Sequence, residues 1–204
     1  MRFNSKLIES AVEQMASLPG VGQRTALRYV MSMLKRKPNE VARFSESIVK
    51  LVSEIRQCEK CHNLCESAVC EICSNPSRDH GTICVVEDIR DFIAIENTNQ
   101  YRGIYHVLGG IISPMDGIGP SDLSIDALLK RVETDKPTEI ILALDASIEG
   151  ETTNFFIFKK LRGFNVRVSN LSRGISFGDQ LEYADEVTLG RSLINRVPYE
   201  TPSV

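Results

Sequence analysis

The stretch Cys58-Glu-Lys-Cys61-His-Asn-Leu-Cys65-Glu-Ser-Ala-Val-Cys70-Glu-Ile-Cys73 decides how the chain is organised, because it separates two parts of different character. Two Cys-x-x-Cys pairs stand eight residues apart in it, and each pair can place two thiolates on one cation. Two such turns that face each other complete a tetrahedral shell of four sulfurs, the closed geometry of structural zinc. We therefore predict that one structural Zn²⁺ is held by Cys58, Cys61, Cys70 and Cys73. The alternative is a set of unmetallated thiols or a redox pair, although redox motifs of this kind normally occur singly.

The remaining cysteines and histidines near this stretch are predicted not to bind the metal. Cys65 lies inside the loop between the two pairs, and His62 and His80 are close in sequence, so the exchange of one ligand stays open. Cys84 lies in the apolar run Ile83-Cys84-Val85-Val86, where we expect a small buried hydrophobic side chain.

Composition excludes several classes of protein. The chain has 204 residues, of which 42% are hydrophobic and 25% charged, as expected for an ordinary soluble protein of one or two small domains. No run approaches the roughly 18 apolar residues that a membrane span needs, and the polar N-terminus lacks the apolar region of a signal peptide. We expect a cytosolic protein without a membrane partner, in which six cysteines do not form a disulfide framework.

Charge is distributed unevenly along the chain. Residues 1–57 contain ten Lys and Arg against five Asp and Glu, whereas the remaining 147 residues contain 14 against 22. A basic segment is what a polyanion requires, since neutralising phosphates releases counterions and supplies most of the sequence-independent affinity. The charge alone is explained more simply by a helical face exposed to solvent. The motif within this segment, however, favours binding to nucleic acid.

That motif is a glycine turn between two predicted helices. Apolar residues recur at helical spacing before and after Leu18-Pro19-Gly20-Val21-Gly22, which is too short for anything but a tight turn. The element resembles the helix-hairpin-helix of DNA repair proteins, which recognises the shape of the nucleic-acid backbone. A third helix is predicted from Val41 to Ile55, after a break at Pro38-Asn39.

We predict that four residues of this element bind phosphate. A glycine turn that leads into a helix exposes backbone N–H groups, and the positive end of the helix dipole favours an anion there. Two arginines one helical turn apart can flank the same phosphate track. The predicted DNA-binding residues are Gly20, Gly22, Arg24 and Arg28.

After Thr82 the pattern changes to short apolar strands that alternate with helices. This alternation predicts a mainly parallel sheet covered by helices. Ser124 is predicted to cap one helix, and Thr152 or Thr153 to open another. The predicted strands are Ile83–Val86, one within Ile104–Ile112, Glu139–Asp145 and Val166–Val168.

Acidic residues follow two of these strands, where functional groups of parallel sheets gather. Converging carboxylates can hold Mg²⁺, which prefers oxygen ligands. The pattern resembles the Toprim domain of topoisomerases and primases, although the later motif here is Glu149-Gly150-Glu151 in place of Asp-x-Asp. Solvated acids that favour helix N-termini are the alternative. The acids concerned are Glu87, Asp88, Asp91, Asp145, Glu149 and Glu151.

Taken in order, these elements resemble the bacterial recombination mediators of the RecR family. The most specific matches are the stretches 101–110 (Tyr-Arg-Gly-Ile-Tyr-His-Val-Leu-Gly-Gly), 118–123 (Ile-Gly-Pro-Ser-Asp-Leu) and 181–183 (Leu-Glu-Tyr). The resemblance implies a DNA-binding adaptor, not an enzyme, that forms tetrameric rings, binds RecO and RecF, and helps load RecA onto single strands coated by SSB. It also implies zinc on the four cysteines, DNA on Arg24 and Arg28, and partner contacts at Glu87 and Asp91.

Two stretches depart from the family pattern. Leu144-Asp-Ala-Ser147 stands where Thr-Asn-Pro-Thr is expected before Glu-Gly-Glu, and Asn170 stands where an arginine is expected. The first change adds an acid beside Glu149 and so favours a bound cation; the second puts a surface contact of that arginine in doubt.

The predicted fold class is therefore α+β in several parts, with the adaptor function preferred to a Mg²⁺-dependent Toprim-type nuclease or phosphotransferase. A topoisomerase or primase needs more chain than the roughly 120 residues available to the Toprim-like unit. The predicted domains are a basic helical head with the helix-hairpin-helix at 1–56, a four-cysteine zinc element at 57–78, a Toprim-like α/β domain at 79–175 and a C-terminal segment at 176–204.

Overall fold

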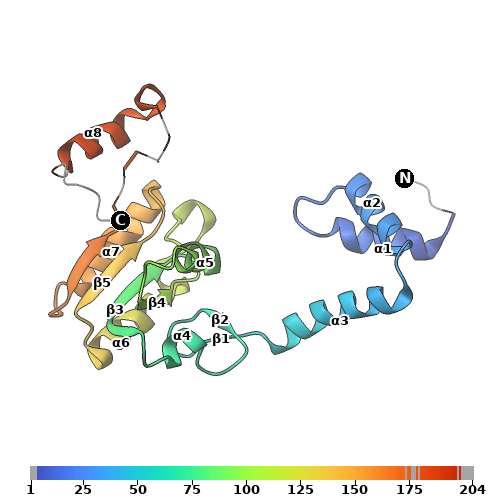
Figure 1. Cartoon of the computed structure of the whole chain (residues 1–204), viewed down its shortest axis with the longest axis horizontal. Coiled ribbons are helices and arrows are strands. Elements are labelled where there is room, and N and C mark those ends of the chain that lie inside the picture. The colour runs from blue at the N-terminus through green and yellow to red at the C-terminus, as the bar shows by residue number, and fades with distance from the viewer. Residues whose placement is uncertain (1–3, 173, 176–177, 179, 197, 199–204) are drawn as a thin grey trace. The chain divides into compact units, whose positions relative to one another are not determined.

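A computed structural model describes residues 4–172, 174–175, 178, 180–196 and 198 of the chain. The chain divides into two compact units, of which the first ends at Ile55 and the second begins at Arg56 (Figure 1). Among the described residues, no helix is long and apolar enough to cross a membrane.

The first unit consists of three helices, α1 (Lys6–Ala16), α2 (Gln23–Met33) and α3 (Pro38–Glu54). Helices α1 and α2 pack against each other through buried Val12 and Ala26 and nearby apolar side chains, as their spacing predicted. Helix α3 begins three residues earlier than expected, because Pro38 occupies its first turn, where a missing backbone N–H costs nothing.

The cysteine-rich stretch forms a small knuckle at the start of the second unit. Strands β1 (Arg56–Gln57) and β2 (Leu64–Cys65) pair antiparallel, and the short helix α4 (Glu71–Ser74) follows. The buried core of the knuckle consists of the four cysteines of the two Cys-x-x-Cys pairs, with Val69 and Ile72 packed against them. So small an element has little other apolar area with which to stabilise itself.

A four-stranded parallel sheet forms the centre of the second unit. The strand order is β4-β3-β5-β6, and the register of each pair is parallel. This arrangement confirms the predicted mainly parallel sheet. The strands are β3 (Asp79–Val86), β4 (Gly103–Val107), β5 (Glu139–Ala143) and β6 (Arg167–Asn170).

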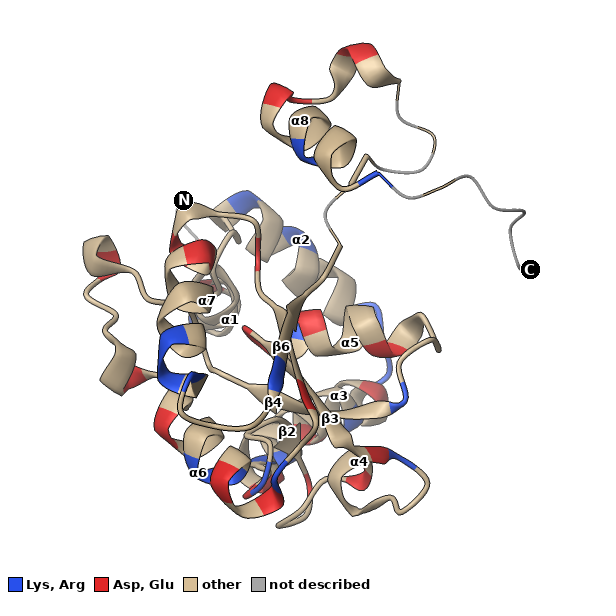
Figure 2. Cartoon of the chain, turned by 90° about the vertical axis from the view of Figure 1, so that its left-hand side faces the viewer, with Lys and Arg blue, Asp and Glu red and all other residues tan. Residues whose placement is uncertain are grey.

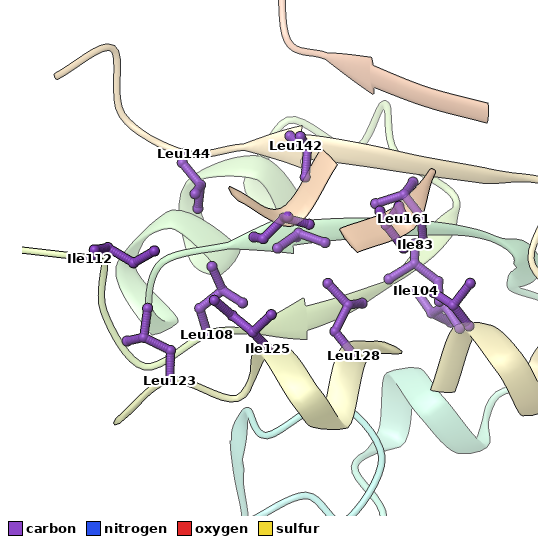
Figure 3. Packing of buried hydrophobic residues seen from close by; sticks show 14 residues of the cluster. Ile83, Ile104, Leu108, Ile112, Leu123, Ile125, Leu128, Leu142, Leu144 and Leu161 are labelled. Atoms are coloured by element: carbon purple, nitrogen blue, oxygen red, sulfur yellow. The ribbon is translucent and has the colours of Figure 1, made fainter. Parts of the chain in front are cut away.

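Helices cover both faces of the sheet. On one face α6 (Ile125–Asp135) and α7 (Ile148–Leu161) bury a large aliphatic cluster, and Figure 3 shows Ile125 and Leu128 directed from α6 toward the strands. On the other face α5 (Ile89–Asn97) packs Phe92 edge-on against Tyr105, at 4.8 Å between ring centroids. Alternate strand residues therefore face two different cores, as period-two patterning requires.

The predicted start of α7 was wrong. The helix begins at Ile148, not at Thr152 or Thr153, because the side chain of Ser147 caps it by accepting a hydrogen bond from the Gly150 N–H at 3.0 Å. Gly150 lies within the first turn, where a Cβ atom would stand 2.2 Å from the backbone oxygen of Asp145. The glycine at this position allows the backbone at Asp145 to approach the first turn of α7 closely; it does not form a loop.

The residue at the start of α6 also acts differently from the prediction. Ser124 occupies the N-cap position, but its hydroxyl does not cap the helix. It donates instead to the carbonyl of Val107 at 2.6 Å.

Strand β4 lies at an edge of the sheet, yet all five of its residues are buried. Its outward backbone groups have partners that come from elsewhere in the unit. The Val107 N–H donates to the Cys61 carbonyl at 2.8 Å, and the buried guanidinium of Arg131 donates to the Tyr105 carbonyl at 2.7 Å. Together with Ser124, these groups fix the cysteine knuckle and α6 against the edge of the sheet.

The remaining described elements are short. Two 3₁₀ turns, Pro114–Asp116 and Pro120–Asp122, lie between β4 and α6, and the 3₁₀ turn Leu181–Tyr183 precedes α8 (Glu186–Ile194). The family-like stretch 181–183 is thus described, whereas Arg173 and several residues of the predicted segment 176–204 lie outside the described residues.

Candidate nucleic-acid interface and metal centre

The turn between α1 and α2 has the geometry that its glycines suggested. Gly20 has φ +75°, the left-handed conformation that favours glycine, and the Val21 N–H closes the turn on the Leu18 carbonyl at 3.1 Å. Gly22 is the N-cap residue of α2 and offers no side chain to its first turn. The N–H groups at this helix N-terminus are therefore open to an external acceptor such as a phosphate oxygen.

Arg24 and Arg28 lie one turn apart on α2, and both are exposed. Among the residues that the structure describes, neither forms an ion pair with an acidic side chain. Figure 2 shows the basic segments of α2 in blue. Their charges are thus not neutralised within the described chain and can act on an anion from outside.

The four cysteines of the two Cys-x-x-Cys pairs converge as predicted. Their sulfur atoms all lie within 4.8 Å of one another, and each residue is at most 6% exposed. A tetrahedral zinc with Zn–S bonds of about 2.3 Å requires sulfurs about 3.8 Å apart, and the Cys61 and Cys70 sulfurs are 3.5 Å apart. The donor set and its spacing therefore fit Zn²⁺ in a closed, structural site.

Electrostatics at this cluster favour a metal-bound thiolate. Hydrogen bonds with Cys61 and Cys73 lower the pKa of the Cys70 thiol, while the hydrogen bond with Cys70 raises the pKa of Cys61. The thiols therefore cannot all ionise by themselves, and a divalent cation supplies the charge that allows it.

The neighbours of the cluster lie outside it. Among the described residues, only the four cysteines bring three or more ligand atoms within such a short distance, and Cys65, His62 and His80 are not among them. Cys65 donates to the Ser67 carbonyl at 2.9 Å, and His80 contacts the Asn75 carbonyl at 3.0 Å. Cys84 is fully buried in the sheet, where desolvation raises its pKa to about 12, in agreement with a hydrophobic role.

Three acids gather at the carboxyl ends of β3 and β5. Glu87 follows β3, Asp91 lies in the first turn of α5, and Asp145 follows β5. Burial and then the nearby charges of Asp91 and Asp145 raise the pKa of Glu87. Burial also raises the pKa of Asp91, whose carboxylate accepts a hydrogen bond from the Asp88 N–H and so completes a capping box.

Glu149 and Glu151 do not join these acids in one ligand cluster. Both lie in the first turn of α7, and Glu151 accepts a hydrogen bond from the buried Asn154 side chain at 3.4 Å. The part of the chain that the structure describes contains no group of three or more carboxylates close enough to share one cation. The convergence of these acids on one Mg²⁺ is therefore not supported.

Known protein families match these parts in the same order. The model for the RecR helix-hairpin-helix matches residues 8–52, and that for the RecR zinc finger domain with four cysteines matches residues 55–75. The Toprim domain model matches residues 81–172, and the RecR C-terminal model matches residues 174–197.

Curated relatives extend this similarity to nearly the whole chain. The recombination protein RecR of Parabacteroides distasonis is 56% identical over 99% of this chain and 97% of its own length. The chain belongs to the RecR family. RecR proteins of Flavobacterium johnsoniae (98% of this chain, 97% of theirs) and Porphyromonas gingivalis (97% and 96%) are each 54% identical. Membership of the RecR family supports a role in recombinational repair.

The raised pKa of Glu87 in this RecR-family chain has a measurable consequence. The Glu87 carboxyl ionises more easily in the unfolded chain than in the folded one. The folded state therefore loses stability as the pH rises from the ordinary pKa of glutamate through the raised pKa of the folded state. We therefore expect Glu87→Gln to raise the melting temperature at pH 7, with the difference vanishing below about pH 4. Thermal unfolding at both pH values tests this, with Glu133→Gln on the exposed surface of α6 as control. A variant that is less stable than the wild type at pH 7 would contradict it.

Two features of this RecR-family structure were not apparent from the sequence. Arg131 is 7% exposed and serves β4 rather than a ligand, a role that depends on tertiary contacts. Tyr29 is exposed on α2 directly after Arg28, and the guanidinium of Arg28 lies 5.8 Å from its ring centroid. A signal for Tyr29 was present, since an aromatic residue adjoins the basic pair, but helical periodicity alone does not distinguish it from a core residue.

Proposed function

We propose that the chain is a DNA-binding adaptor of recombinational repair that works with RecO and RecF to help load RecA onto SSB-coated single strands. The observation that carries this proposal is the open N-terminus of α2 beside two exposed arginines that lack acidic partners in the described chain. Backbone N–H groups and guanidinium groups recognise phosphates without reading bases, as a mediator acting at any sequence requires.

A reconstituted loading assay tests the adaptor function. RecA filament formation on SSB-coated circular single strands should accelerate when the chain is added together with RecO, and neither protein alone should have the full effect. No acceleration with a chain shown to be folded and metal-bound would overturn the proposal.

We propose that the four cysteines hold one structural Zn²⁺, with no catalytic part. Four thiolates leave no coordination position for water or substrate, and the sulfurs are buried. When bound, the metal supplies charge and crosslinks the knuckle. The residues of the knuckle then hold β4 through the Cys61 carbonyl.

An alternative function is metal-dependent hydrolysis of DNA by the acids that follow β3 and β5, although these acids form no ligand cluster among the described residues. Hydrolysis requires only a metal and a positioned water. Labelled single-stranded and duplex DNA incubated with Mg²⁺ or Mn²⁺ distinguishes the two functions. Cleavage that Glu87→Gln abolishes would establish a nuclease and displace the adaptor proposal.

We also propose that copies of the chain assemble through α3, so that several basic heads surround one DNA molecule. Helix α3 buries none of its residues against the described remainder of the chain. Apolar residues along one side of α3, together with its C-cap residue, recur at alternating spacings of three and four, which is the pattern of a helix that packs lengthwise against another helix. A second copy offers the identical seam, as two-fold symmetric contacts require. The seam consists of Val41, Phe44, Ile48, Leu51 and Ile55, and Phe44, Ile48 and Leu51 are exposed.

Placing a charge in this seam should weaken assembly. Ile48→Glu puts a carboxylate into the apolar contact of both copies, so we expect the dissociation constant of the assembly to rise by about 100-fold or more. Sedimentation velocity over a range of protein concentrations measures this. Ser53→Glu makes the same change in charge on the opposite side of α3 and should leave the assembly intact. Equal effects of the two variants would show that α3 is not the interface.

A further inference from the structure

We propose that Tyr29 stacks on an unpaired base, and that it makes the basic surface of α2 prefer single-stranded DNA to duplex DNA. This inference rests on the proposed DNA binding and adds the class of nucleic acid to it. It concerns the first unit of the chain alone, in which α2 and α1 pack together.

The position of Tyr29 is not explained by packing. Helix α2 contacts α1 through Ala26 and Val30, which are at most 5% exposed, and this face accounts for the apolar core of the unit. Tyr29 follows Arg28 outside that core, and the residue remains 42% exposed. A large aromatic side chain gains little for the fold in such a place.

The ring lies next to the cations that are proposed to bind phosphate. The guanidinium of Arg28 is 5.8 Å from the centroid of the Tyr29 ring, and Arg24 is one helical turn before Arg28. A ring beside guanidinium groups is the combination by which proteins bind single strands, since the cations track the backbone while the aromatic face receives a base. The base and its phosphate are neighbours in the nucleotide, as the ring and Arg28 are on the helix.

The same combination discriminates against duplex DNA. In a duplex each base face is covered by the adjoining base pairs, so a surface tyrosine cannot reach one without breaking a stack. In a single strand the bases are accessible, and stacking on an aromatic side chain tolerates every sequence because every base has a π-face. Arg24 and Arg28 contact phosphates of either form, whereas Tyr29 adds affinity only for the single strand.

Binding of three oligonucleotides to the full-length, metal-loaded chain tests the proposal. The probes are an oligo(dT), an oligomer of equal length with abasic sites throughout, and a duplex of equal length, each followed by fluorescence anisotropy. Tyr29→Ala should weaken binding to oligo(dT) by about fivefold to tenfold, the lower part of the range for one stacked base. Binding to the abasic strand and to the duplex should stay unchanged.

Matched variants separate stacking from other effects. Tyr29→Phe keeps the ring and should bind oligo(dT) like the wild type, whereas Tyr183→Ala removes an exposed tyrosine from the second unit and should change nothing. Equal loss on all three probes, or no loss on any, would overturn the proposal. So would a change in the assembly mass of Tyr29→Ala, because the ring would then belong to a protein interface.

A spectroscopic readout observes the stacking directly. The chain contains no tryptophan, so Tyr29→Trp introduces a single indole. Stacking should quench its emission when oligo(dT) binds, with much less quenching by the abasic strand at equal saturation. Tyr183→Trp serves as the control. Unquenched emission at saturating oligo(dT) would contradict the stacking of this residue.

Failure of the inference and failure of the proposed function give different results. If replacing Arg24 and Arg28 lowers affinity for all three probes while Tyr29→Ala has no selective effect, the chain binds DNA and the stacking proposal alone is wrong. If neither the arginines nor Tyr29 affects affinity for any probe, DNA binding through α2 is itself refuted.

Discussion

Cys70→Ser should unfold the cysteine knuckle and lower the stability of the second unit by several kcal/mol, with a fall in melting temperature of about 10 °C. The four sulfurs form the buried core of the knuckle, so losing one ligand removes the crosslink and leaves polar atoms buried without the cation. An element too small to build its own core depends on the free energy of metal binding to fold. The effect extends to the sheet because the Cys61 carbonyl accepts a hydrogen bond from Val107.

Thermal unfolding together with elemental analysis measures this effect. The wild type should contain about one zinc per chain and lose stability on chelation, while Cys70→Ser should contain little zinc. Cys65→Ser is the matched control, since it makes the same substitution in the same stretch at a thiol outside the cluster. A metal-free wild type with unchanged stability would refute the structural role of the site.

Reversing the charge of the basic pair should have the largest effect on function. Arg24→Glu combined with Arg28→Glu is expected to weaken DNA binding by about 100-fold or more at low salt, for every sequence. Each lost phosphate contact should also reduce the slope of log affinity against log salt by about one. In an assembly of several chains the loss multiplies, because each head contributes to the same binding event.

The control must carry the same change of net charge. Lys159→Glu with Lys160→Glu replaces two exposed lysines in the last turn of α7, away from the glycine turn in sequence and in the other unit. This variant should retain most of its affinity and the full salt dependence. If the two double variants lose affinity equally, net charge rather than the α2 surface governs binding.

The knuckle and the hairpin could be predicted from the sequence because their determinants are local. The spacing of the two Cys-x-x-Cys pairs predicts four candidate ligands, and their sulfurs lie close together as expected. In the hairpin, Gly20 has the positive φ that its place in a tight turn requires. The parallel sheet followed from the alternation of apolar strands and helices, and it was confirmed; each predicted strand overlaps an observed one, although β3 begins four residues earlier than predicted.

Features that depend on tertiary contact could not be predicted in the same way. Glu149-Gly150-Glu151 was interpreted as a motif at the end of a strand, but Gly150 is helical, and its lack of a side chain accommodates the Asp145 carbonyl. The sequence pattern makes Arg131 an ordinary residue of an amphipathic helix, whereas in the fold its buried guanidinium donates a hydrogen bond to the Tyr105 carbonyl. In both cases the group that determines the role is a backbone carbonyl elsewhere in the chain. Residue type and periodicity therefore do not predict the contact.

Within the described part of the chain, the β4 border of the sheet is covered, so β6 is the border on which another strand can add. Exposed strand borders act as templates for cross-β growth and for exchange of strands between chains. Here Arg131, Ser124 and the cysteine knuckle occupy the backbone groups that such a template would offer. Among the described strands, β6 is the one at the opposite border. A strand from another chain is therefore expected to pair with β6, whereas the knuckle blocks pairing along β4.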